Sequence, residues 1–296
     1  MKKILIALLL ILFCNLSIHA KGYSSIEELL KDEFNTEFAD YMRQANFTNE
    51  DNEIALEIYT LRGNPEKLIP LAKKLSNKGY SLGDYWLGWC YEGGDGVGMD
   101  FEQAFKYFFK AAKNQVPFPY ALERVGSYYY SGEGVNKNLT EAYNWFDKAK
   151  KIIKHKDYQA ICMYRQAYIL LNKEKPTPSD FETAFNLFTQ VSELSNPHVG
   201  SNFGHPAYGN LVPYMHKHSA FLAAMLILTE DVLGGNETEG IKWLQKAAEL
   251  GDNEAQFHYG VYLIHATNQK DKGMDWVSKA AIQGNSDALI YLQQNK

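Results

Sequence analysis

The stretch AFKYFFKAA at residues 104–112 recurs along the chain with small changes. Three further copies are AYNWFDKAK at 142–150, GIKWLQKAA at 240–248 and GMDWVSKAA at 273–281, and AFNLFTQVS at 184–192 is a divergent fifth. Each copy has a small residue, an aromatic residue or leucine three positions later, and Lys or Gln three positions after that. Repetition at this spacing indicates an array of similar units, which presents an extended surface rather than a sealed pocket.

Each copy is predicted to form the second helix of a helical hairpin. In 83–112 the first helix should end at Gly93-Gly94, because glycine adopts the positive φ that closes a helix. Asp100 should then cap the second helix, with Gln103 as its reciprocal partner. The same capping spacing recurs at Asn138 with Glu141, Ser179 with Glu182 and Asn236 with Glu239. The pattern predicts a helix, a turn and a capped helix, repeated.

The spacing of the copies sets the domain organisation. The copies that start at Ala104, Ala142 and Ala184 follow one another at 38 and 42 residues, whereas the next gap, to Gly240, is 56 residues. That gap holds a proline- and glycine-rich stretch, which predicts an irregular insertion at 196–213. We therefore expect a solenoid of about six hairpins over 51–296, preceded by an N-terminal helical segment at 21–50 with a helix at 24–45.

Three stretches also share a pattern in the first helix and the turn. ALERVGSYYYSGEGV at 121–135 combines A-x-x-x-[apolar]-G-x-x-Y with a G-x-G-V turn, and 83–97 and 255–263 match in part. Together with W-x-x-K-A-A, this resembles the Sel-one-like repeat, a relative of the tetratricopeptide repeat. The resemblance covers about residues 50–296, weakly at 155–235. It implies an all-α fold, an α-solenoid of stacked antiparallel helical hairpins.

The chain start and the charge bear on location and partners. Lys2 and Lys3 precede an apolar run that ends before Ala20, so residues 1–20 are predicted to be a cleaved signal peptide and the protein to be periplasmic or secreted. Acylation of Cys14 would need small residues before it, whereas Leu12-Phe13 are bulky. Removal of the peptide takes the formal charge from −5 to −7, and no basic cluster remains to bind nucleic acid. The chain has no second apolar stretch long enough to span a membrane, so we expect no stable membrane insertion after cleavage.

Candidate chemistry is sparse. The chain has no G-x-S-x-G, H-E-x-x-H or C-x-x-C motif, so we predict no enzymatic activity and no cofactor. Cys90 and Cys162 are expected to be buried thiols, although export would permit a bridge between them. Four histidines gather near the insertion, but their spacing lacks a regular i,i+4 pair, so no metal site is predicted; they are His198, His205, His216 and His218.

Two stripes of the helices differ in their predicted roles. Trp145, Trp243 and Trp276 of the second helices are predicted to lie in the core between hairpins. In the first helices, positions two, six and nine after the small residue fall on a face that repeat packing does not use. First helices in this family resemble those that line a concave face. The predicted partner-binding residues are therefore Tyr85, Trp89, Glu92, Glu123, Ser127 and Tyr130. In later hairpins the same stripe falls at Cys162, Gln166, Ile169, Phe257, Val261 and Ile264.

Two functions from different classes remain at this stage. The first is an exported, non-catalytic scaffold that binds another protein, and an immunity or inhibitor protein is a narrower form of it. The second is a cell-wall- or carbohydrate-directed hydrolase that uses acidic residues such as Glu92 and Glu123. For Tyr85 and Trp89 the alternative to partner binding is packing against the N-terminal helix.

Overall fold

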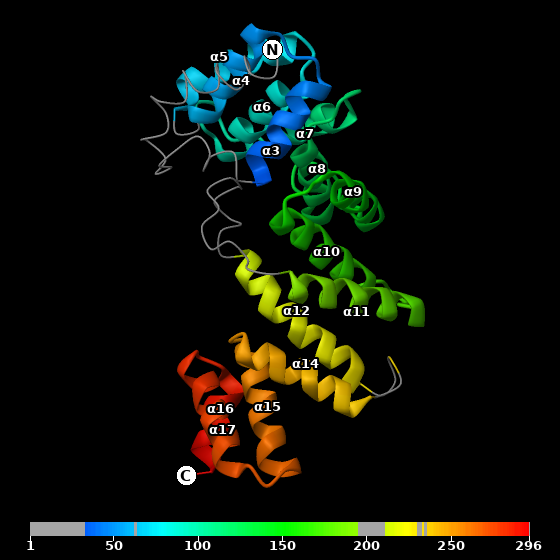
Figure 1. Cartoon of the computed structure of the whole chain (residues 1–296), viewed down its shortest axis with the longest axis vertical. Helices are drawn as coiled ribbons and strands as arrows, with labels where there is room; N and C mark the ends of the chain where they lie inside the picture. Colours follow the sequence, from blue (N-terminus) through cyan, green and yellow to red (C-terminus); the bar gives the residue numbers. More distant parts are fainter. Residues whose placement is uncertain (1–32, 62–63, 195–210, 230–232, 234–235, 296) are drawn as a thin grey trace, which may run out of the picture. The chain divides into compact units, whose positions relative to one another are not determined.

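A computed structural model describes residues 33–61, 64–194, 211–229, 233 and 236–295 (Figure 1). In these residues the structure has fourteen helices and no strand, so the predicted all-α solenoid of helical hairpins is confirmed. The chain divides into two compact units, Met1–His155 and Lys156–Lys296. None of the helices described is both long enough and apolar enough to cross a bilayer. The predicted signal peptide lies outside the described residues.

Among its described residues, the first unit has one N-terminal helix and three hairpins. Its helices are α3 (Glu33–Gln44), α4 (Asn49–Thr60), α5 (Pro65–Asn77), α6 (Ser81–Gly93), α7 (Phe101–Lys113), α8 (Pro119–Ser131) and α9 (Leu139–Ile152). The hairpins pair α4 with α5, α6 with α7, and α8 with α9. Helix α3 falls within the helix predicted at 24–45, and residues 24–32 lie outside the described residues.

The predicted turn glycines and N-cap residues of this unit are confirmed, but the cap side chains of α7 and α9 accept from the backbone N–H of Gln103 and Glu141 without the predicted reciprocal side-chain bond. Gly94 and Gly132 follow α6 and α8 with φ of 71° and 83°, a conformation that favours glycine. Asp100 then accepts a hydrogen bond from Gln103 N at 2.9 Å, at the start of α7. Asn138 caps α9 in the same way. The hairpin geometry is thus set by local residues.

A glycine in the first helices α6 and α8 lets the second helix of the same hairpin approach closely. A Cβ added to Gly88 would lie 2.9 Å from the Phe108 ring, and one added to Gly126 would lie 2.8 Å from the Phe146 ring. Both rings are fully buried. These phenylalanines stand four residues after the small residue of the repeated motif, one position beyond the aromatic residue that the pattern singles out. The fourth position therefore forms the centre of each hairpin.

This register corrects the prediction for two of the three tryptophans. Trp145 is buried, but Trp243 and Trp276 are only half-buried and pack against the edge of their core cluster. The core positions next to them are filled by Leu244 and Val277. The tryptophans lie at the edge of the core because the fourth position of the motif faces the partner helix.

The second unit, over the residues that the structure describes, has three hairpins and a last single helix. Its helices are α10 (Lys156–Leu171), α11 (Pro178–Glu193), α12 (Leu211–Leu228), α14 (Glu237–Glu249), α15 (Asn253–Ala266), α16 (Lys270–Ile282) and α17 (Ser286–Gln294). The hairpins pair α10 with α11, α12 with α14, and α15 with α16 (Figure 1).

Two boundaries in this unit differ from the prediction. Helix α11 is capped by Thr177, which forms a capping box with Asp180, and the predicted cap Ser179 lies inside the helix. The predicted insertion at 196–213 extends too far at its C-terminal end, because α12 already begins at Leu211. Residues 195–210 lie outside the described residues. Pro213 is tolerated there because the first turn of a helix does not need the backbone N–H.

Candidate functional site

The N-terminal helix α3 lies on the first helices of the first unit (Figure 1). Tyr41 Oη is 2.8 Å from Ser81 Oγ and accepts a hydrogen bond from Leu82 N at 3.0 Å, both at the start of α6. Its ring packs edge-on against Phe118, with 5.1 Å between the ring centroids. Burial raises the pKa of Tyr41 to about 12, so the phenol stays protonated at neutral pH.

A buried carboxylate fixes the other end of α3. Glu37 accepts hydrogen bonds from Tyr120 Oη at 2.6 Å, in α8, and from Lys154 N at 2.8 Å, after α9. Lys154 Nζ also lies 3.0 Å from Asp40 of α3. Helix α3 therefore covers the N-terminal ends of α6 and α8. The part of the predicted binding face at these ends is buried inside the unit.

The six predicted partner-binding residues separate into two groups. Tyr85, Glu92 and Glu123 are buried, at 9%, 8% and 0% exposure. The others, Trp89, Ser127 and Tyr130, are half-buried.

Tyr85 takes part in core packing. Its ring lies 5.6 Å from that of Phe108 and 4.7 Å from that of Phe118, which also contacts Tyr41 and Phe38 of α3. Tyr85 therefore packs beside the N-terminal helix, which was the alternative to partner binding for this residue. Trp89 contacts Trp86 edge-on at 5.8 Å.

The two glutamates are held by bonds within the unit. Glu92 of α6 forms an ion pair with Arg124 of α8, and the Arg124 guanidinium lies 5.4 Å from the Phe108 ring centroid. Glu123 accepts a 2.5 Å hydrogen bond from Ser127 Oγ, one turn along its own helix. The Glu92–Arg124 pair joins neighbouring hairpins, whereas Glu123 bonds within its own helix, and both arrangements favour a structural role over a pair of catalytic acids.

The remaining part of the face is a small aromatic surface. We define the first-helix patch as Trp89, Ser127 and Tyr130, which lie in the C-terminal halves of α6 and α8. The Glu92–Arg124 ion pair joins the same two helices. Half-buried aromatic side chains on a rigid support are well suited to contacts between proteins.

The same stripe is packed internally in the second unit. Cys162, Gln166 and Ile169 of α10 are buried. Phe257, Val261 and Ile264 of α15 pack against the last core cluster, where α17 lies; Phe257 contacts Tyr291 of α17 at 6.2 Å. The stripe pattern alone does not distinguish a surface from a contact with the next helix.

The histidines and cysteines have separate surroundings. His216 Nε2 donates to Leu194 O at 2.9 Å, and burial lowers the His216 pKa. His218 Nδ1 lies 3.1 Å from Asp252, which caps α15. The described residues hold no group of three or more metal-ligating side chains, and His198 and His205 lie outside them. Cys90 and Cys162 are buried thiols that form no disulfide.

Sequence reasoning did not identify Arg124 or Glu37. Arg124 follows Ala121 by three positions, where the repeat pattern has no assigned role. A charge at that position beside Glu92 of the preceding hairpin could have indicated the ion pair. Glu37 lies outside the repeats, and nothing in its surrounding sequence indicates which hairpin it meets.

The fold and the patch define a helical-repeat protein of the α-solenoid class. The sequence matches the Sel1 repeat four times, at residues 71–116, 119–151, 219–252 and 253–285, and the resemblance to Sel-one-like repeats is thereby confirmed. The unmatched stretch between the second and third repeats contains α10, α11 and the insertion. Repeats of this family generally mediate contacts between proteins.

One solved structure supports the fold, and a second is reported as similar. A Sel1 repeat protein from Oxalobacter formigenes is 19% identical with a TM-score of 0.55, and the match covers 79% of this chain and 84% of that one. A protective antigen of uropathogenic Escherichia coli with an SLR fold is 17% identical with a TM-score of 0.49, over 92% of this chain and 60% of that one. A search of curated proteins gave no match.

Proposed function

We propose that this protein is an exported, non-catalytic scaffold that binds a protein partner in the periplasm or outside the cell. The observation that supports it is the first-helix patch: Trp89 and Tyr130 are half-buried on helices that the buried Glu92–Arg124 pair joins. Rigid aromatic anchors lose little side-chain freedom on binding, so they contribute strongly to affinity. A protein that neutralises an effector, such as an immunity protein, is the narrower form of this proposal.

The test uses the mature chain as bait in the exported fraction of the source cells. A captured protein is purified, and its affinity is measured by calorimetry for the unaltered chain, Trp89→Ala and Tyr130→Ala. We expect each variant to lose about thirtyfold or more in affinity, since anchor residues cost about 2 kcal/mol or more when truncated. Tyr214→Ala, which removes an exposed aromatic residue of the second unit, is the matched control and should bind normally.

Melting temperatures separate binding from folding. Because Trp89 and Tyr130 are half-buried, both variants should melt within a few degrees of the unaltered chain. Normal affinity in both variants would overturn the assignment of the patch. Release of soluble fragments from purified peptidoglycan, abolished by Glu92→Gln, would overturn the non-catalytic reading. Export is tested separately, by sequencing the N-terminus of the protein recovered outside the cytoplasm.

A further inference from the structure

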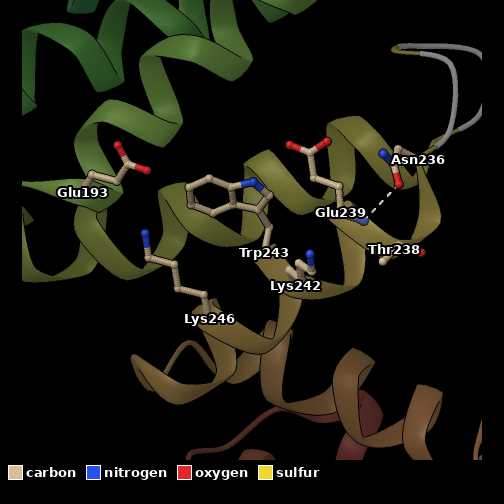
Figure 2. A pocket seen from close by; sticks show the side chains of 7 residues that line it. All are labelled: Glu193, Asn236, Thr238, Glu239, Lys242, Trp243 and Lys246. Carbon is tan, nitrogen blue, oxygen red and sulfur yellow. Dashed lines mark hydrogen bonds between the residues drawn. The ribbon is translucent and has the colours of Figure 1, made fainter.

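The second unit has a pocket between α11 and α14. Its volume is about 580 Å³. Figure 2 shows the indole of Trp243 between the carboxylates of Glu193 and Glu239. Lys242, Lys246 and Asn236 also line it. All these residues belong to one compact unit.

The pocket arises from a departure from the repeat. Trp145 of α9 occupies the same motif position as Trp243 of α14, three residues after the small residue. Trp145 is only 3% exposed, since two residues of the preceding second helix cover its ring. Phe109 contacts the ring edge-on at 5.8 Å, and Lys113 Nζ lies 5.5 Å from the ring centroid.

The corresponding positions before Trp243 carry different residues. Phe109 and Lys113 stand five and nine residues after Ala104, and the matching residues after Ala184 are Thr189 and Glu193. Thr189 bonds back to its own helix, at Asn186 O. Thr189 in place of Phe109 removes the large aromatic cover, and Glu193 in place of Lys113 exchanges an ammonium group for a carboxylate. The Trp243 indole is therefore half-buried, and the pocket forms beside it.

The indole of Trp243 is nevertheless held in place. Phe185 of α11 packs edge-on against it at 6.3 Å, and Lys246 Nζ lies 4.4 Å from its ring centroid. The ring also packs against the core cluster that includes Leu244. A fixed, partly exposed aromatic ring is a preformed binding platform.

The charges around the ring indicate the chemical class of ligand. Two carboxylates, of Glu193 and Glu239, face two ammonium groups, of Lys242 and Lys246, so their formal charges cancel. Burial lowers the pKa of Lys246, while the charge of Glu193 opposes this shift. An acidic peptide would be repelled by the carboxylates and a basic peptide by the lysines. Hydroxyl groups are compatible with both kinds of charged group in the pocket, because they donate to carboxylates and accept from ammonium groups.

We propose that the Trp243 pocket is a subsite for an uncharged saccharide, with the C–H face of a pyranose ring lying on the indole. The hydroxyls of the sugar donate to Glu193 and Glu239 and accept from Lys242. The sugar belongs either to a polysaccharide or to the glycan of a glycoprotein, since both present the same ring chemistry. This site does not depend on the first-helix patch, which lies in the other unit.

The experiment titrates cellobiose, maltose and N,N′-diacetylchitobiose into the mature full chain and follows binding by calorimetry and saturation-transfer NMR. At least one disaccharide should bind, and Trp243→Phe should weaken it several-fold through loss of ring area. Glu239→Gln should weaken it about tenfold, because a bond to a charged acceptor is replaced by a bond to a neutral one. The Glu239 side chain is exposed, so this variant should fold normally.

Trp276→Phe is the matched control. Trp276 has the same motif position and its own lysine, Lys279, at 4.0 Å, but it does not line the pocket. This variant should bind as the unaltered chain does. The proposal is overturned if no disaccharide binds at millimolar concentration, or if Trp243→Phe and Glu239→Gln leave the affinity unchanged. It is also overturned if a triarginine or triglutamate peptide displaces the sugar at lower concentration. Binding to immobilised cellulose and chitin then tests a polysaccharide as the source. Binding to a glycoprotein, with its deglycosylated form as control, tests a protein-linked glycan.

Discussion

At the scale of single residues, the recurring W-x-x-K has a direct physical explanation. Lys148, Lys246 and Lys279 each place Nζ 4.0 to 4.4 Å from the ring centroid of the tryptophan three residues earlier. Each pair is a cation–π contact on the outer edge of its hairpin, contributing about 0.5–1 kcal/mol at exposed sites. The lysine stem also shields the indole, which allows a tryptophan to remain at a half-buried position.

Asp51 provides a residue-scale prediction about pH. Its burial opposes ionisation, but hydrogen bonds from Lys78, Thr48 and Tyr80 outweigh this and lower its pKa from 3.8 to about 2. The folded-state pKa is below the unfolded one, so the carboxylate stabilises the fold above about pH 4 and this contribution is lost as the pH falls to 2. Asp51→Asn should therefore reduce the free energy of unfolding by about 2 kcal/mol at pH 7.

Urea denaturation between pH 7 and pH 2 measures this effect. The difference between Asp51→Asn and the unaltered chain should shrink as the pH falls below 4. Glu50→Gln is the control, because the neighbouring Glu50 makes only an exposed ion pair with Lys74. It should reduce stability much less than Asp51→Asn does, because solvent screens this exposed pair. An equal effect of both substitutions would show that the buried bonds of Asp51 contribute nothing specific.

At the scale of helices, the local elements were predictable and their long-range contacts were not. Gly94, Gly132 and Asp100 act within a few residues of their own position, so the sequence predicted their roles. The cap of α11 was missed because two capping boxes overlap, Thr177 with Asp180 and Ser179 with Glu182. Pro178 favours the first, since proline is preorganised for the first helical position.

The predicted site shows the same limit. Trp89 and Tyr130 remain at the surface of their helices, whereas Glu92 and Glu123 were placed on that surface by periodicity and are buried in the structure. Periodicity identifies a face of one helix. Whether that face meets water, the next hairpin or α3 depends on contacts between residues more than thirty positions apart, such as Glu92 with Arg124.

Gly126 in α8 tests the close approach between helices. An added Cβ would lie 2.8 Å from the Phe146 ring, which is fully buried and cannot move outward. Gly126→Ala should therefore destabilise the protein by about 1–3 kcal/mol despite the better helix propensity of alanine. Gly98→Ala is the control, because nothing lies within 4 Å of an added Cβ there. Thermal unfolding should show a lower melting temperature for Gly126→Ala alone; equal melting temperatures would contradict the packing argument.

At the scale of the whole molecule, the chain combines two Sel1-repeat segments that belong to different compact units. The matched repeats at 71–116 and 119–151 fall in the first unit, and those at 219–252 and 253–285 fall in the second. The stretch between them carries only the divergent copy at 184–192, and the Trp243 pocket lies where the matched repeats resume. Departures from a repeat are positions that stacking alone does not constrain, which is where a separate binding function can develop.

Because each repeat contacts mainly its neighbours, a local packing defect should remain within its own unit. Gly260→Ala is suited to test this, since an added Cβ would lie 2.8 Å from Gly273 O, a backbone atom, and would force α15 and α16 apart. Hydrogen exchange should become faster in α14 to α17, through opening of the hairpins beside the defect, and remain unchanged in α6 to α9. Gly98→Ala, in the first unit, serves as the control for an unperturbed chain. Faster exchange in both units would mean that they unfold as one cooperative body, and the two binding surfaces would then be coupled through stability.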